Sequence, residues 1–393
     1  MRVKPADRTH GVQEYYFSAK LKQIEELRRN GADVINLGIG SPDMPPSPNT
    51  LTKLMTEGQK PNVHGYQSYI GIPALRSAFS GWYLKYFNVR LNPDNEILPL
   101  MGSKEGIMHI SMAFVNPGDE VLVPDPGYPA YSAVTNLVGG RVKTYPLTEE
   151  NGWYPDLQEL EKADLTGVKL MWINYPHMPT GTRGSRELFQ KIVSFGIKHN
   201  ILICNDNPYS FILNREHHSI LSAENATEIA LELNSLSKSH NMAGWRMGMV
   251  AGNKDYIDQI LRVKSNMDSG MFLPVQIAAA EALNNPESWY DSLNSVYMER
   301  RKIAEEIMEA LGCDFDPEQI GLFLWGRLPE NIGSSESFAD DLLTKAHLFI
   351  TPGFIFGKRG EGYVRISLCS NEVTLRRARD RVASFVNNSQ STN

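Results

Sequence analysis

Two hydrophobic patterns alternate through the middle of the chain. Between residues 97 and 285, short runs of β-branched and aliphatic residues are separated by stretches with helical periodicity, such as SRELFQKIVSFGIKHN. The runs are EVLVPD, RVKTYPL, VKLMWINYP, ILICND, IALELNSL and MGMVAG. Strands that alternate with helices predict an α/β fold in which helices cover both faces of a largely parallel sheet. In such sheets, ligands bind beyond the carboxyl ends of the strands.

A different pattern begins at Pro286, which opens a long helical stretch, ESWYDSLNSVYMERRKIAEEIMEALG. The apolar residues that fall roughly along one stripe of this helix are Leu293, Val296, Tyr297, Ile303 and Ile307. The chain continues with GLFLWGRL, a helix around FADDLLTKAH, LFITPG, YVRISL and a terminal helix, NEVTLRRARDRVASFV. This succession predicts a second, smaller α+β domain.

The N-terminal segment predicts an arm and then a helix, YYFSAKLKQIEELRRNG, which Gly31 closes. We expect this segment to join the smaller domain. The predicted division is a large domain over residues 45–285 and a small domain over residues 1–44 and 286–393, with a frayed polar tail, NNSQSTN.

Composition narrows the class of protein. The 393 residues are 41% hydrophobic and 21% charged, as in an ordinary globular enzyme. A net charge of −6 argues against nucleic-acid binding, which needs a basic face, and no apolar run approaches the about 20 residues that cross a bilayer. The N-terminus lacks the apolar segment of a secretory signal, so we expect a cytoplasmic protein. Cys204, Cys313 and Cys369 lack metal-site spacing and are expected in the core, with no metal bound.

The segment SLSKSHNMAGWR, from Ser235 to Arg246, combines a lysine with groups that bind phosphate. A lysine that forms a Schiff base with a phosphorylated aldehyde needs hydroxyl donors and a guanidinium for the phosphate. Lys238 has Ser235 and Ser237 before it and Arg246 after it. The alternative is a polar turn with an ordinary surface lysine, because short motifs also match by chance.

A second candidate phosphate site is the turn MGSKEG, which follows EILPL and precedes a helical pattern. A glycine turn that opens a helix presents free backbone N–H groups and the positive end of the helix dipole. Gly102 would form the turn, and the N–H groups of Ser103 and Lys104 would bind the anion. A simple helix cap by Ser103 explains the turn equally well.

Three further residues suit a flat heterocycle. Asp206, which ends the run ILICND, can keep a pyridine nitrogen protonated, and Tyr209 can hydrogen-bond a phenolic oxygen on the same ring. Tyr128, in the loop PDPGYPAY, can cover the ring. Each also has an ordinary explanation, since Asp is common at strand-end turns and loop tyrosines usually pack.

Arg365 lies between Val364 and Ile366 in a β-rich run. Strand alternation favours a solvated side chain, and the alternative is a buried fork that binds a carboxylate. The pair His217-His218 is expected in a surface loop and not at a metal site.

The motifs INLGIGSPD, YQSYIGIPALR, GSKEGI, NPGDEVLVPDPGYPAY, NYPHMPTG, DNPY, SLSKSHNMAGWRMG and GYVRISLC occur in this order along nearly the whole chain. Together they resemble the aminotransferase class I/II family of pyridoxal-phosphate enzymes of fold type I. The resemblance implies a large domain with a mostly parallel seven-stranded sheet between helices, and a smaller α+β domain. It also implies ping-pong transfer of an amino group from an L-amino acid to a 2-oxo acid, by family habit 2-oxoglutarate.

The resemblance assigns roles to the matching residues. Lys238 would carry the cofactor as an aldimine and then move the proton, Asp206 and Tyr209 would bind the ring, and Tyr128 would stack on it. Arg365 would bind the substrate α-carboxylate with the backbone around Gly40. The phosphate would be held by Gly102, Ser103, Lys104, Ser235, Ser237 and Arg246. Tyr66 would reach the phosphate of a partner subunit, which implies a homodimer with shared active sites.

One departure from the family lies in NYPHMPTG, where the family has Asn directly before Pro-Thr-Gly and this chain has Met178. Methionine cannot donate a hydrogen bond to the phenolic oxygen of the cofactor. Either Tyr209 binds that oxygen alone, or His177, Asn174 or water replaces the missing donor. A hydrogen bond to a charged group contributes about 1.5–3 kcal/mol. We therefore expect a raised imine pKa and a changed rate, with the same reaction.

Within the family, GSKEGI, NPGDEVLVPDPGYPAY, KSNMDSG and GYVRISLC look most like the L,L-diaminopimelate aminotransferase branch. That branch has a glutamate in the YQSYIG stretch for the distal ammonium, where this chain has Tyr69 and Ile70. Leaving an ammonium unpaired in a buried site is costly. We therefore expect an uncharged or aromatic amino donor, with L,L-diaminopimelate as the alternative.

Two other functions stay open. A carbon–sulfur β-lyase would use the same cofactor and the same motifs. A non-catalytic cofactor-binding protein would not need Lys238, Asp206, Tyr209, Arg246 and Arg365 together, so the sequence argues against it.

Overall fold

The computed structural model describes residues 3–9 and 16–390, with side chains up to residue 387. Parts of the predicted N-terminal arm, residues 1–2 and 10–15, and the last three residues of the predicted frayed tail lie outside the described residues. None of the described helices is long and apolar enough to span a bilayer. The three cysteines are buried, as predicted.

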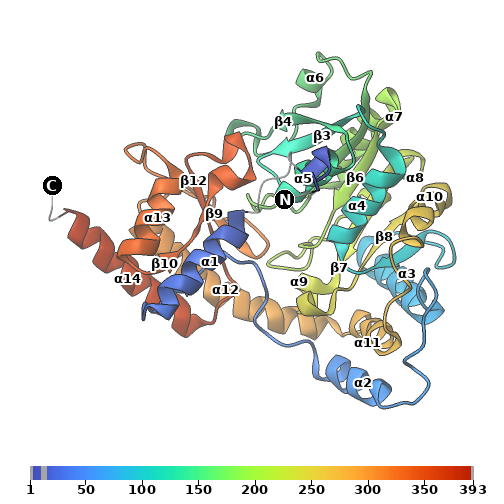
Figure 1. The fold of residues 1–393 in the computed structure, drawn as a ribbon, viewed down its shortest axis with the longest axis horizontal. Helices are drawn as coiled ribbons and strands as arrows, with labels where there is room; N and C mark the ends of the chain where they lie inside the picture. Colours follow the sequence, from blue (N-terminus) through green and yellow to red (C-terminus); the bar gives the residue numbers. More distant parts are fainter. Residues whose placement is uncertain (1–2, 10–15, 391–393) are drawn as a thin grey trace.

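A mixed, mostly parallel sheet forms the centre of the larger lobe (Figure 1). Within the described residues it has seven strands, in the order β2-β8-β7-β6-β5-β3-β4. Strand β8 runs antiparallel to both of its neighbours, and the other neighbouring pairs are parallel. The strands are β2 (Ile97–Leu100), β3 (Glu120–Asp125), β4 (Arg141–Pro146), β5 (Val168–Ile173), β6 (Leu202–Asp206), β7 (Ala230–Ser235) and β8 (Gly248–Gly252). The sheet predicted from the alternating pattern is confirmed.

Alternate residues of these strands enter two separate cores, one on each face of the sheet. One core packs against α4 (Ser103–Phe114), α5 (Pro129–Leu137) and α10 (Lys254–Lys264). The other packs against α3 (Pro73–Phe87), α7 (Arg186–His199) and α11 (Leu273–Leu283). The ends of α7 follow from its sequence, because the Ser185 hydroxyl accepts from the Leu188 amide at 3.1 Å and Asn200 ends the helix at φ 54°. The remaining helices of this lobe are α2 (Pro48–Gly58), α6 (Leu157–Leu160), α8 (Ala226–Ile229) and α9 (Leu236–Ser239).

The smaller lobe contains a three-stranded antiparallel sheet in the order β11-β12-β9 and a separate parallel pair. The parallel pair joins β1, from the N-terminal part of the chain, to β10, which lies more than 300 residues later. The strands are β1 (Ile35–Asn36), β9 (Phe323–Arg327), β10 (Leu348–Phe349), β11 (Thr351–Pro352) and β12 (Tyr363–Ser367). The helices are α1 (Tyr16–Arg29), α12 (Glu287–Ala310), α13 (Ser335–Lys345) and α14 (Glu372–Gln390).

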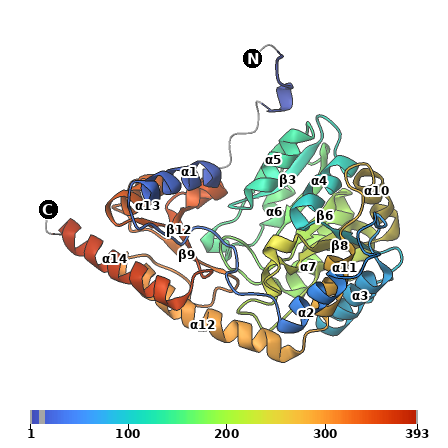
Figure 2. The ribbon, with the colours of Figure 1, turned by 60° about the horizontal axis from the view of Figure 1, so that its bottom comes forward.

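Helix α12 runs along both lobes, with α14 packed beside its far end and α11 at its start (Figure 2). The N-terminal helix α1 lies on the small lobe, where Ile24 and Val34 pack against Leu343 and Phe349. The strands of the large sheet fall between residues 97 and 252, consistent with the predicted large domain. The exact boundaries at residues 45 and 285 stay a prediction.

Candidate active site

A cavity of ≈ 700 Å³ lies beyond the carboxyl ends of the central strands and extends to the small-lobe sheet. Strands β6 and β7 end at Asp206 and Ser235, and α4 begins just after β2. The predicted site residues that line this cavity are Gly40, Ser103, Lys104, Tyr128, Asn174, Asp206, Tyr209, Ser235, Ser237, Lys238, Arg246 and Arg365. The fold therefore gathers residues that are up to 325 positions apart in the sequence.

Lys238 lies in the short helix α9, directly after β7. The Ser235 hydroxyl caps this helix by accepting from the Ser237 amide at 3.2 Å. The Lys238 ammonium donates to the Gly40 carbonyl. Burial lowers the pKa of Lys238, and the nearby cations Arg365 and Arg246 lower it further. A buried amine with a depressed pKa is suited to act as a nucleophile and as a base.

Arg246 lines the cavity and lies against the turn at Gly102, a predicted site residue that is not itself among the lining residues. Gly102 precedes α4 at φ 87°, and a Cβ atom at this position would lie 2.2 Å from the Arg246 guanidinium. The positive φ favours glycine here, because other residues rarely adopt that backbone conformation. The Ser235 and Ser237 hydroxyls are joined by a hydrogen bond of 2.9 Å on the neighbouring strand end. A helix N-terminus, two hydroxyls and a guanidinium on one cavity wall form a site for a phosphate group.

Asp206 is 4% exposed, and its two carboxyl oxygens have different surroundings. Oδ2 accepts from the Tyr131 hydroxyl at 3.0 Å, whereas Oδ1 has no hydrogen-bond partner among the described residues. Burial raises the pKa of Asp206 to about 6, although the hydroxyls of Tyr131 and Ser103 oppose the shift. A buried oxygen without a donor, on the wall of a cavity, fits a ligand that brings its own N–H group.

The residue missed by sequence reasoning is Tyr131, which binds Asp206 and stacks on Trp172 with ring centres 5.0 Å apart. It follows Tyr128 by three residues in PDPGYPAY, and this one-turn spacing on α5 was the available signal. Tyr128 itself is half-buried and meets the Tyr131 ring edge-on at 5.6 Å. The pair therefore forms one aromatic wall of the cavity.

Tyr209 and Asn174 also line the cavity, and both side chains are buried. Burial raises the pKa of Tyr209 well above its ordinary value, so its hydroxyl stays protonated and can donate. Asn174 donates to the Asp206 carbonyl and accepts from the Met178 amide at 2.9 Å. Asn174 thus braces the Asp206 strand against the loop that carries Met178.

The expectation of a solvated Arg365 is wrong, and the buried alternative holds. Arg365 is 4% exposed, its guanidinium lies 3.8 Å from the centre of the Phe323 ring, and it donates to the Gly38 carbonyl at 2.8 Å. Strand alternation failed here because both faces of β12 are covered. Val364 and Ile366 pack in the small-lobe core, and Arg365 lies against the Phe323 and Phe356 rings at the cavity. A buried guanidinium on an aromatic ring can bind a carboxylate with two parallel hydrogen bonds.

Met178 lines the cavity, and its sulfur accepts from the Arg365 guanidinium at 3.2 Å. His177, considered as a substitute donor, does not line the cavity. Its ring is hydrogen-bonded to the Thr180 hydroxyl at 2.8 Å, and burial lowers its pKa to about 3. His177 is therefore a neutral packing residue.

Tyr66 and His217 lie outside the cavity. Tyr66 does not line the cavity and is 93% exposed, so its role toward a partner subunit stays a prediction. His217 is not a free surface residue, because it is half-buried and stacks on Phe211 with ring centres 4.1 Å apart. An alternating or polar sequence around a histidine does not reveal such packing.

The cavity residues fit pyridoxal 5′-phosphate. No donor in the described part of the chain binds Oδ1 of Asp206, so a pyridinium N–H could bind there, and the turn before α4 brings backbone N–H groups beside the Arg246 guanidinium. Lys238 would supply the amine for the aldehyde of the cofactor. The donors that would hold the phosphate belong to Ser103, Lys104, Ser235, Ser237 and Arg246.

Known proteins resemble this chain in sequence and in fold. The family model for aminotransferase class I and II matches residues 32–382. The LL-diaminopimelate aminotransferase of Dehalococcoides mccartyi (strain 195) is 40% identical over 98% of this chain and 99% of its own. That of Aquifex aeolicus is 40% identical over 96% and 98%. The substrate-bound structure of BacF from Bacillus subtilis superposes with a TM-score of 0.93 at 33% identity, covering 98% of both chains.

The raised pKa of Asp206 predicts a pH-dependent effect of Asp206→Asn on the cofactor-free protein. The unfolded carboxyl titrates near 3.8 and the buried one at about 6, so ionised Asp206 destabilises the native state increasingly as the pH rises. Relative to wild type, the free energy of unfolding of the variant should rise by about 1 kcal/mol between about pH 5 and about pH 8. Urea unfolding at both pH values measures this.

The same variant should bind pyridoxal 5′-phosphate at least about tenfold more weakly, because a neutral amide does not stabilise a positive ring nitrogen. A pH-independent change in stability, or unchanged cofactor affinity, would contradict this account of Asp206.

Proposed function

Because the chain belongs to the aminotransferase class I and II family, it is a pyridoxal-phosphate-dependent transaminase, and we propose that Lys238, Asp206 and Arg365 carry its chemistry. The observation that supports this most is their convergence on one cavity. A base, a buried carboxylate and a buried guanidinium lie around a single space of ≈ 700 Å³. Its substrates are an amino acid and an oxo acid.

When bound, pyridoxal 5′-phosphate accepts the electron pair that remains on the substrate Cα after its proton leaves. Arg365, whose guanidinium is held by the Gly38 carbonyl, binds the substrate α-carboxylate. Lys238, whose lowered pKa favours the neutral amine, takes the proton from Cα. Asp206 keeps a proton on the ring nitrogen, and the Tyr209 hydroxyl donates to the phenolic oxygen.

Two amino donors are supported by different observations. The curated relatives at about 40% identity are LL-diaminopimelate aminotransferases, which favours LL-diaminopimelate. The cavity favours an apolar or aromatic donor, because Asp206 is the one acidic residue among its described lining residues. The lining residues with large apolar side chains are Phe17, Leu21, Ile39, Met178, Phe323 and Phe356.

Tyr69 and Ile70, on which the expectation of a different donor was based, do not line this cavity. A residue that recognises a distal ammonium would therefore have to come from outside the cavity wall of this subunit. The relatives favour a donor with a distal ammonium and the apolar lining favours a donor without one, so a direct comparison of donors decides between them.

A panel of amino donors with 2-oxoglutarate tests the proposed function. We expect kcat/KM for the best donor to exceed that for the others by at least about tenfold, since one extra pocket contact contributes about 1–3 kcal/mol. If LL-diaminopimelate is the best donor, this chain has the activity for which its relatives are named. If phenylalanine or methionine is the best donor, the apolar lining of the cavity determines the choice of donor. Arg365→Lys should reduce kcat/KM for every donor. Release of pyruvate and ammonia from a cysteine conjugate without an oxo acid would contradict transamination and indicate a β-lyase.

Met178 predicts a spectroscopic effect in the cofactor-loaded enzyme. Asparagine at this position would donate to the phenolic oxygen of the cofactor, which methionine cannot do. The pKa that controls the visible absorbance should therefore be lower in Met178→Asn than in wild type. The measurement is an absorbance titration of both proteins, with Met178→Leu as an apolar control that should resemble wild type. An equal or higher value in Met178→Asn would contradict this role.

We also propose that the enzyme acts as a homodimer with shared active sites. Large apolar side chains remain exposed on two adjacent segments, around Tyr66 and Tyr69 and around Met267 and Phe272. The segments are adjacent because His64 stacks on Phe272 with ring centres 5.8 Å apart, and Lys264 donates to the Tyr69 carbonyl at 2.9 Å. Such a surface favours burial against a second copy.

Subunit complementation tests the shared site. Tyr66→Ala and Lys238→Ala homodimers should each have little activity. Each mixed dimer would contain one site with both residues intact, so random exchange should restore about a quarter of the wild-type activity. The assay follows transamination after the two variants are unfolded and refolded together. Failure to regain activity despite mixed dimers would place Tyr66 outside the partner's site.

A further inference from the structure

The segment of residues 38–45, here called the strap, crosses from the small lobe to the large lobe between β1 and α2. Its backbone contacts two proposed functional side chains directly. The Gly38 carbonyl accepts from Arg365 at 2.8 Å, and the Gly40 carbonyl accepts from Lys238. The position of the strap backbone therefore affects how both side chains are held.

The strap passes close to two aromatic rings. A Cβ atom at Gly38 would lie 2.4 Å from the Phe349 ring, and one at Gly40 would lie 2.2 Å from the Phe323 ring. These approaches limit how far the backbone can move toward the small lobe. They do not limit movement away from it, into the cavity or toward solvent.

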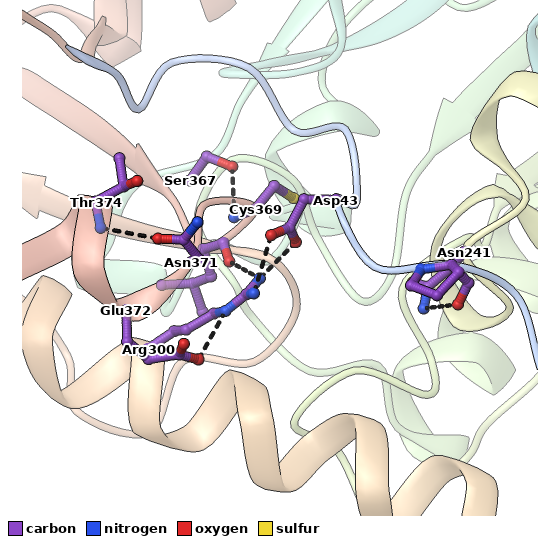
Figure 3. Close-up of polar contacts among 10 residues, drawn as sticks. Asp43, Asn241, Arg300, Ser367, Cys369, Asn371, Glu372 and Thr374 are labelled. Atoms are coloured by element: carbon purple, nitrogen blue, oxygen red, sulfur yellow. Dashed lines mark hydrogen bonds and ion pairs between the residues drawn. The ribbon is translucent and has the colours of Figure 1, made fainter.

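Asp43 and Arg300 supply the constraint in that direction (Figure 3). Arg300, on α12, is 3% exposed and binds Asp43 with two hydrogen bonds, of 2.6 and 3.0 Å. The same guanidinium donates to Glu372 at 3.2 Å and to the Leu368 carbonyl at 3.2 Å. Arg300 thus joins the strap to α12 and to the start of α14.

A second contact holds the end of the strap. Asn241, three residues after Lys238, donates to the Pro45 carbonyl at 3.1 Å (Figure 3). Asn241 is 7% exposed and adopts a left-handed backbone with φ 55°. The loop that carries Lys238 is therefore attached to the strap at both Gly40 and Pro45.

We propose that Asp43 and Arg300 are positioning residues for the substrate, because their ion pair fixes the strap whose carbonyls hold Arg365 and Lys238. Only Ser41 and Pro42 separate Gly40 from Asp43, so a shift of the carboxylate is transmitted to the carbonyl over a short length of backbone. Moving the strap would leave the Arg300 guanidinium buried without its bidentate partner, which is strongly unfavourable. This inference rests on the proposed role of Arg365 in binding the substrate carboxylate.

Asp43→Asn tests the proposal because it preserves the side-chain shape and removes the charge. We expect KM for the best amino donor to rise about tenfold to a hundredfold, the range that small misplacement of binding groups produces. The affinity for pyridoxal 5′-phosphate should change much less than KM, because the residues assigned to the phosphate, Ser103, Ser235 and Arg246, lie outside the strap.

Glu372→Gln is the matched control. It also removes a carboxylate from Arg300, and the exposure of the two carboxylate side chains is similar, at 36% for Glu372 and 33% for Asp43. Because Glu372 lies on α14 and not on the strap, its variant should lower the melting temperature without the rise in KM. Equal KM values for the two variants would overturn the proposal.

Two further variants make the outcomes distinct. Asn241→Ala, which removes the Pro45 contact, should also raise KM and replaces Asp43→Asn if that protein does not fold. Arg365→Lys reports on the proposed function itself. A raised KM in Arg365→Lys alone would overturn the strap proposal and leave the function intact. An unchanged KM in both Arg365→Lys and Asp43→Asn would overturn the assignment of the carboxylate site.

Discussion

Desolvation of charged groups in one cavity is the constraint on which the rest of the structure depends. Asp206 and Arg365 are each 4% exposed, and Lys238 lies between them with a lowered pKa. In water these groups would be ionised and separately hydrated, and burial removes that hydration. Burial shifts the pKa values of Asp206 and Lys238 toward their neutral forms. Pyridoxal 5′-phosphate and an amino acid carry groups of complementary charge, which would stabilise the ionised forms when bound.

The fold holds these groups in place by using segments from both ends of the chain. Strand β1 pairs with β10, which brings the strap beside Arg365, and α12 carries Arg300 beneath the strap. The large sheet supplies Asp206 and Lys238 from adjacent strand ends. Under the proposed function, a substrate between the two lobes would meet Arg365 on the small lobe and Lys238 on the large lobe, which would give its Cα a defined position relative to Lys238.

The sequence was sufficient for the sheet, the long helices and the residues that meet in the cavity, because strand-end motifs of a parallel sheet converge at one edge. It was misleading where local pattern and tertiary position differ. Alternation around Arg365 indicated solvent, whereas the rings of Phe323 and Phe356 and the backbone of Gly38, which are distant in the sequence, bury it. Neither Tyr131 nor the Asp43–Arg300 pair, whose members are 257 residues apart, has a local signature that marks its partner.

The central claim is that Lys238 is the residue to which the cofactor binds covalently. Borohydride reduction of the protein loaded with pyridoxal 5′-phosphate, followed by tryptic digestion and mass spectrometry, tests it most directly. The account predicts one labelled peptide, modified at Lys238, and no label in Lys238→Ala. A label on another lysine, or none in the wild-type protein, would contradict the account.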